Sequence, residues 1–174
     1  MSDTSETTVT KVKRSLVAQF LNTTPSSTSA TWSRMGKGIT TGTIAYNPST
    51  TTEQYIDEDS ATTTLDSYAP ALETAQTAYA GNPVFDYVDG LRKSRAVGSA
   101  ADTQLMLVYM YDYTESSSTR TYAAELQNVN ISITDFGGDA GGAAVCNYTV
   151  NFVGDPQIGT ATITSGVPTF TAAT

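Results

Sequence analysis

Histidine is absent from the 174 residues of this chain, and cysteine occurs only once, at Cys146. The first absence removes the commonest general base and metal ligand, and the second excludes an intrachain disulfide. No apolar run approaches the length of about eighteen residues that a transmembrane helix needs. The N-terminal residues carry no basic segment followed by an apolar run, so no signal peptide is predicted. These absences favour a soluble, non-enzymatic protein made in a cytoplasm, with no cofactor and no membrane partner.

Positive charge is also scarce. Nine Lys and Arg residues stand against seventeen Asp and Glu residues, which gives a formal net charge of −8. Such a balance disfavours a protein that grips nucleic-acid phosphates over its whole surface. The length of the chain predicts a single domain, 1–174, that can bury a real core.

Thr, Val, Ile and Tyr are abundant, and they are the residues that fit a half-buried, pleated surface. One stretch departs from this pattern. Asn82 followed by Pro83 is a favourable helix start, and Val84, Val88 and Leu91 then recur at helical spacing. The sequence therefore predicts one amphipathic helix at about 82–97, ended by a left-handed residue at Gly98, with Gly90 permitting close backbone approach.

About eight strands are expected in the rest of the chain, starting with one from Val9 to Leu21. The stretch 104–113 is apolar on both faces, so it is predicted to be a central strand covered by the helix. In 121–133 the apolar positions change from even to odd numbers, which predicts a bulge near Gln127. Asp155–Pro156 is expected to turn the chain before a last strand. The predicted fold class is mostly β, a sandwich or barrel of two packed sheets with one flanking helix.

A long loop is expected in the N-terminal third, between a basic end (Arg34, Lys37) and an acidic end (Asp57, Glu58, Asp59). Within it, 39–46 and 51–56 are predicted to pair as a weakly apolar hairpin that projects. Residues 1–8 and 166–174 are predicted to be flexible tails, with no further C-terminal domain.

A recognisable pattern is spread over many positions in the last two thirds of the chain: Tyr68–Ala69–Pro70, the run Asn82 to Val88, Leu91–Arg92, Arg95 to Gly98, Val108–Tyr109, Gly154–Asp155–Pro156, Gly159–Thr160 and Phe170. In this pattern the chain resembles the tail tube (major tail) proteins of long, flexible-tailed, siphovirus-type bacteriophages. The order of strand pair, helix, core strand, long hairpin and final strand is similar as well.

The resemblance implies a structural virion protein that self-assembles into homo-hexameric rings, stacked into a hollow tube for the genome. The implied partners are the tape-measure, tail-terminator and baseplate proteins, with DNA only as non-specific cargo in transit. The implied location is the tail of the virion, after assembly in the host bacterial cytoplasm. The inner tube of a phage-derived bacteriocin or of a secretion system would share this fold.

A different class of function also fits a β-sandwich, namely a module that binds cell-surface carbohydrate. Tyr109, Tyr111 and Tyr113 could form a stacking platform, but their apolar neighbours favour the core instead. For a tube, four acidic residues are expected to line the channel, and these are Asp66, Glu73, Glu125 and Asp135. The loop residues Arg34, Lys37, Asp57, Glu58 and Asp59 are expected to contact the adjacent ring.

Overall fold

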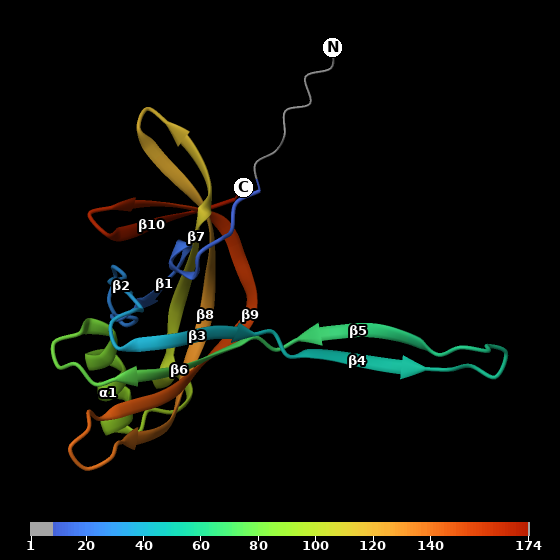
Figure 1. Ribbon diagram of the computed structural model, residues 1–174, viewed down its shortest axis with the longest axis horizontal. Coiled ribbons are helices and arrows are strands. Elements are labelled where there is room, and N and C mark those ends of the chain that lie inside the picture. The colour runs from blue at the N-terminus through green and yellow to red at the C-terminus, as the bar shows by residue number, and fades with distance from the viewer. Residues whose placement is uncertain (1–8, 174) are drawn as a thin grey trace.

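The computed structural model describes residues 9–173 (Figure 1). Residues 1–8 and 174 lie outside this range, so the predicted N-terminal tail is outside the described residues. Two short 3₁₀ turns, η1 (Arg14–Leu16) and η2 (Gly98–Ala101), precede β1 and β7. The other elements are β1 (Val17–Asn22), β2 (Trp32–Arg34), β3 (Ile39–Ala45), β4 (Pro48–Glu53), β5 (Thr62–Tyr68), β6 (Ala71–Thr77), α1 (Pro83–Ser94), β7 (Asp102–Ser116), β8 (Thr119–Gly137), β9 (Val145–Thr164) and β10 (Val167–Ala172).

Eight strands form one antiparallel sheet in the order β2-β1-β7-β8-β9-β6-β3, with β10 pairing with β9 beside this path. A separate two-stranded sheet consists of β4 and β5. The predicted fold class, mostly β with one flanking helix, is confirmed. In detail, one eight-stranded sheet, rather than two sheets packed face to face, contributes to both hydrophobic cores.

The main sheet bends where β8 and β9 lose their regular register. Leu126 pairs with Gln157 and Asn128 pairs with Val153, so Gly154, Asp155 and Pro156 bulge out of β9 opposite Gln127. The side-chain amide of Gln127 donates to the carbonyl oxygens of Val153 and Gly154, at 2.9 and 3.0 Å. The predicted bulge near Gln127 is confirmed. The predicted turn at Asp155–Pro156 is wrong, because β9 continues through these residues.

This bend creates two cores, one on each face of β7. Leu105 and Leu107 face a helix-side core. This core also contains apolar residues of α1 and of the lower halves of β8 (128–137) and β9 (145–153). Met106 and Val108 face a smaller hairpin-side core, formed with Phe20 and with the upper halves of β8 (119–126) and β9 (157–164). All four of these β7 side chains are buried. The predicted central strand is therefore confirmed.

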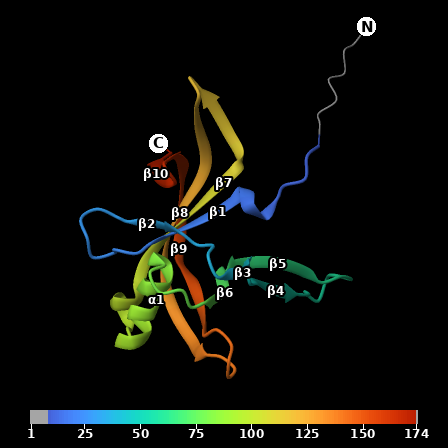
Figure 2. The same ribbon diagram turned by 60° about the vertical axis from the view of Figure 1, so that its left-hand side comes forward.

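Helix α1 starts as the sequence indicates, with the Asn82 side chain accepting a hydrogen bond from the Phe85 amide at 3.0 Å. Val84, Phe85 and Val88 are buried in the helix-side core. Figure 2 shows α1 beside the lower part of the main sheet. Two details differ from the prediction. The left-handed residue that ends the helix is Arg95 (φ 50°) rather than Gly98, and its amide bonds back to Leu91 and Arg92. A Cβ on Gly90 would meet no atom within 4 Å, so this glycine permits no close approach.

The strands of the N-terminal third pair differently from the prediction. Ile39–Ala45 pairs with β6 in the main sheet, and Pro48–Glu53 pairs with β5. The predicted hairpin of 39–46 with 51–56 is therefore wrong. The reason is burial, because Ile44 of β3 packs on the helix-side core whereas every residue of β4 and β5 is exposed. The β4–β5 ribbon, called the arm here, projects away from the rest of the molecule (Figure 1).

Both described ends of the chain also differ from expectation. β1 begins only at Val17, and Val9 and Val12 are exposed rather than in a strand. Residues 167–172, predicted to be a flexible tail, form β10 and pair with the end of β9. Pro168 is buried and Phe170 packs on the hairpin-side core. Gly159 is required there, since a Cβ at this position would lie 2.2 Å from the Thr171 carbonyl oxygen.

Candidate assembly surfaces

The sheet face opposite α1 is polar over β3, β6 and the lower halves of β8 and β9. Alternation places Leu72 and Tyr148 in the helix-side core, so their neighbours Glu73 and Thr149 point to the opposite face, where they pair with each other. Asn147, Asn151, Asn130, Ser132 and Asp135 extend this surface, which we call the polar face.

Amide and hydroxyl groups are linked by hydrogen bonds across the polar face. Asn151 donates to the side-chain oxygens of Asn130 and Ser132, both at 3.0 Å, and Asn147 donates to Asp135 at 2.7 Å. None of the nine basic residues falls in the four strand segments 39–45, 71–77, 128–137 and 145–153. The polar face is therefore well hydrated, hydrogen-bonded and negative.

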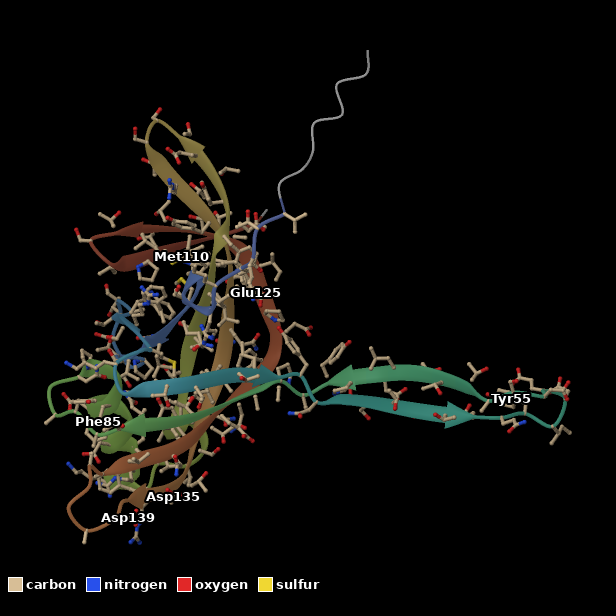
Figure 3. All side chains as sticks on the ribbon, viewed as in Figure 1. Tyr55, Phe85, Met110, Glu125, Asp135 and Asp139 are labelled. Carbon is tan, nitrogen blue, oxygen red and sulfur yellow. The ribbon has the colours of Figure 1, made fainter. Side chains whose placement is uncertain are left out.

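The four acidic residues expected to line a channel fall into two pairs. Glu73 and Asp135 share the polar face. Asp66 and Glu125 instead lie together along a groove at the root of the arm. Figure 3 shows Glu125 near the middle of the sheet and Asp135 close to its lower end.

The groove, called the arm-root groove, has a volume of about 880 Å³ and lies between the arm and the bend of β8 and β9. Its walls carry three carboxylates (Asp66, Glu125 and Asp155), the rings of Tyr46 and Tyr68, and three prolines (Pro48, Pro70 and Pro156). The two tyrosine rings meet edge to face, with centroids 6.2 Å apart. Burial raises the pKa of Tyr109, and the nearby carboxylate of the groove residue Glu125 raises it further.

The arm is held together by its own polar side chains. The Thr51 hydroxyl donates to Asp66 at 2.6 Å, and the Thr52 and Thr63 hydroxyls lie 3.0 Å apart. At the tip, Tyr55 and Ile56 are exposed beside the acidic run 57–59 (Figure 3). A projecting ribbon with apolar and acidic groups at its end can contact a second molecule without disturbing either core.

The basic residues expected to act with that acidic run lie elsewhere. The Arg34 guanidinium donates to the Ser15 carbonyl oxygen at 3.3 Å, and Lys37 lies over the Tyr79 ring at 5.2 Å. Neither belongs to one of the three ion pairs found within residues 9–173. Figure 1 shows β2 and the start of β3 on the side opposite the arm tip, so a contact between the acidic tip and these two residues would join different subunits.

A third region connects α1 to the β8–β9 hairpin. Asp89 accepts from Arg92 and Lys93, each at 2.6 Å, and Arg92 stacks on Phe136 with its guanidinium 4.0 Å from the ring centroid. The hydrogen bond from Lys93 is the main cause that lowers the pKa of Asp89.

The tyrosines of β7 are only partly in the core. Tyr109 packs against the helix-side core, as expected, but Tyr111 and Tyr113 are exposed. The prediction that all three are core residues is wrong for these two, because β7 extends beyond the body of the sheet into the β7–β8 hairpin. Their rings lie against other tyrosines, Tyr111 on Tyr109 and Tyr113 on Tyr122.

Sequence reasoning missed the arm-root groove and the role of Gln127 in the bend. The three prolines of the groove are separated by up to 108 residues, and each indicates only a local turn. Gln127 was visible only as the point where the apolar pattern changes phase. The thiol of Cys146 is buried in the helix-side core.

Within residues 9–173, no cluster of acidic, Cys or His side chains has the geometry to hold a metal ion. In that same part of the chain, no helix is long and apolar enough to cross a membrane.

Comparison with solved structures gives an informative match. No family model matches the chain, and no curated protein is similar to it in sequence. Among solved structures, it is similar to a chain in the tail of an empty gene transfer agent (GTA) particle, refined with helical and C6 symmetry. The TM-score is 0.59 at 12% identity, and the match covers 85% of this chain and 98% of the GTA chain.

This protein has the fold of that tail subunit. The similarity extends over nearly the whole of the GTA chain, so it is not limited to one local motif.

Proposed function

We propose that this protein is the subunit of a phage-type tail tube, in which homo-hexameric rings stack around a channel for the genome. The observation that carries the proposal is the fold shared with a subunit of a C6-symmetric tail. A siphovirus-type tail is the specific form we favour, since the sequence pattern from Asn82 to Gly98 resembles those tube proteins. The tube of a bacteriocin particle or of a secretion system would use the same assembly. In the phage case, the protein would assemble in the host cytoplasm, reside in the virion and meet tape-measure, terminator and baseplate proteins.

The surfaces of the subunit support a ring. A closed ring needs a head-to-tail contact between different surfaces of identical subunits. The main sheet ends in β2 on one side and β3 on the other, and each of these strands pairs on one edge only. Edge-to-edge pairing of neighbouring subunits would continue the sheet around the channel.

The polar face is our proposed channel wall, with Glu73 and Asp135 as its acidic residues. DNA carries about one negative charge per 1.7 Å of its axis, so a basic wall would hold it through many phosphate contacts. An acidic wall repels it, and screening within roughly 8 Å at physiological salt keeps this repulsion short-ranged. The duplex would stay hydrated and centred. The expected wall role of Asp66 and Glu125 stays a prediction, since the arm-root groove suits them to another contact.

Assembly of the purified protein is the direct test. Negative-stain electron microscopy should show rings or hollow tubes, and their end views should have six-fold symmetry. A protein that stays monomeric at every concentration and salt tested, by light scattering and by microscopy, would refute the proposal.

The wall assignment has its own test. Replacing Glu73 and Asp135 with Lys in an assembled tail should leave the tube intact and slow genome ejection, most strongly at low salt. The matched control, Glu73→Gln with Asp135→Asn, removes the charge without reversing it and should slow ejection much less. Normal ejection from the Lys tail at low salt would reject the electrostatic role of these residues.

A further inference from the structure

The segment Val9–Lys13 lies exposed and outside regular structure just before β1. Val9 is 95% exposed and Val12 is 51% exposed. Lys11 and Lys13 are exposed as well, and neither takes part in the ion pairs found within residues 9–173. The segment thus presents two cations and two valines that its own subunit does not cover.

Arg14 fixes the point from which this segment leaves the body. Its guanidinium donates to the Val17 carbonyl oxygen at 2.6 Å and to the Gly42 carbonyl oxygen at 3.1 and 3.3 Å. These bonds attach the base of the segment to β1 and β3, while residues 9–13 stay free of the sheet. Such an anchored, extended segment can reach a neighbouring molecule from a defined starting position.

The arm-root groove has the opposite character. All of its charged lining residues, Asp66, Glu125 and Asp155, are acidic. They do not converge in the way a metal site requires. Carboxylates distributed along a groove suit an extended partner that carries several separate cations.

The spacing of the segment meets this requirement. In an extended strand the rise is about 3.3 Å per residue, so Lys11 and Lys13 point to the same side, roughly 6.6 Å apart. Tyrosine and proline rings offer apolar surface to the valines and to the methylene stems of the lysines, and the tyrosine faces attract an ammonium group. The groove supplies both kinds of surface through Tyr46, Tyr68 and its three prolines.

We propose that the arm-root groove of one subunit is the docking site for Val9–Lys13 of a neighbouring subunit. This inference rests on the proposed function and names one of its contacts. The contact joins two different surfaces of the same chain, so it propagates from subunit to subunit and suits a tube. The charged pairs set the register and the rate of assembly more than the affinity.

Charge reversal on each side of the contact provides the test. The segment variant is Lys11→Glu with Lys13→Glu, and the groove variant is Asp66→Lys with Asp155→Lys. All four residues are exposed and none belongs to either core, so the body of both variants should fold and melt as in the wild type. Asp66→Lys also removes the hydrogen bond from Thr51 within the arm, so recovery of tubes in the mixture, rather than their loss from one variant, identifies the groove contact. Each variant alone should lose at least tenfold in sedimentable tubes, because its segment and its groove then carry charge of the same sign.

An equimolar mixture of the two variants should form tubes again. The reversed groove accepts the reversed segment, and the unchanged groove of the segment variant accepts the unchanged segment of the other. The matched control variant is Asp112→Lys with Asp139→Lys, which changes the net charge equally at exposed sites outside the groove. It should form tubes alone, and it should leave the segment variant largely in the supernatant when the two are mixed.

Several results would overturn the inference. Wild-type amounts of tube from either reversal variant, or rescue by the control variant, would show that the groove and segment do not make this contact. Rescue only when all four reversals are in one chain would place the contact inside one subunit. In each of these cases wild-type tubes would still support the proposed function, whereas wild-type protein that forms no tubes would reject both proposals.

Discussion

The middle of β7 and the arm show two ways in which one chain makes regular β-structure. Leu105 and Val108 are fully buried, and both faces of β7 are covered by separate cores. Every residue of the arm strands is exposed, and the arm is held by ladder bonds and by hydroxyl contacts such as that of Thr51 with Asp66. Burial of apolar surface stabilises the middle of β7, whereas the arm gains little stability from such burial.

This difference separates folding from assembly. A two-stranded ribbon alone is only marginally stable in water, so the arm depends on the body to which it is attached. The body does not depend on the arm, because no arm residue belongs to either core. Substitutions in the two regions should therefore affect different measurements.

The largest effect on stability is expected at the helix. Phe85→Ala should lower the free energy of unfolding by about 3–5 kcal/mol, because it leaves a cavity in the helix-side core. Chemical denaturation measures the change. Tyr55→Ala at the arm tip removes a similar ring from an exposed site and should have almost no effect. Equal losses from both substitutions would mean that the arm contributes to the fold as the core does.

A smaller change of opposite sign is expected at Gly90. Gly90→Ala should raise the free energy of unfolding by about 1 kcal/mol, since alanine is the better helix former and its Cβ would meet no neighbour. Gly159→Ala is the matched control, and it should destabilise the protein because the new Cβ would clash with the Thr171 carbonyl. A destabilised Gly90→Ala variant would show that the space beside the helix is occupied in solution.

A third effect, of about 0.3–1 kcal/mol, is expected from the ion pairs of Asp89. The pKa of this carboxylate is lowered in the folded protein, so its stabilisation is fully present above the unfolded value of about 3.9 and is lost as the pH falls through the lower folded value. Wild type should therefore exceed Asp89→Asn in stability at pH 7, and the difference should shrink below pH ~3.9. A difference that is unchanged at pH 2 would exclude this electrostatic origin.

The smallest effect on stability is expected from shortening the arm. Removing 51–64 and joining Thr50 to Leu65 through Asn-Gly should leave the melting temperature nearly unchanged, because all removed residues are exposed. Assembly should respond strongly, and we expect rings or monomers instead of tubes in electron micrographs. Long tubes from the shortened protein would mean that the arm does not connect adjacent rings.

The same contrast explains what the sequence could predict. Helix α1 and the middle of β7 were identifiable because their signals are local, an Asn-Pro start in one case and apolar residues on both faces in the other. The bend at Gln127 was identifiable because alternation must change phase there. Each of these signals lies within about one element of the chain.

Pairing between distant strands had no comparable signal. The sequence predicts that β3 pairs with the next strand along the chain. In the structure it pairs with β6, which is separated from it in the sequence by both strands of the arm. The weak apolar content of 167–172 hid β10, which depends on Gly159 for its close approach to β9. The sequence predicts that a polar, acidic sheet face exists. Which residues lie on that face depends on the strand pairings, so the sequence alone does not distinguish Glu73 and Asp135 from Asp66 and Glu125.

The bend in β8 and β9 has a mechanical consequence. Both strands run without interruption through the two cores, and the Gln127 amide ties them together where the direction changes. One core cannot melt without releasing the strands on which the other is built, so the body should unfold in a single cooperative step. A force applied at the β7–β8 hairpin would be transmitted along the backbones of β8 and β9 to the β8–β9 hairpin at the far end. The subunit would therefore resist the force as a single mechanical unit.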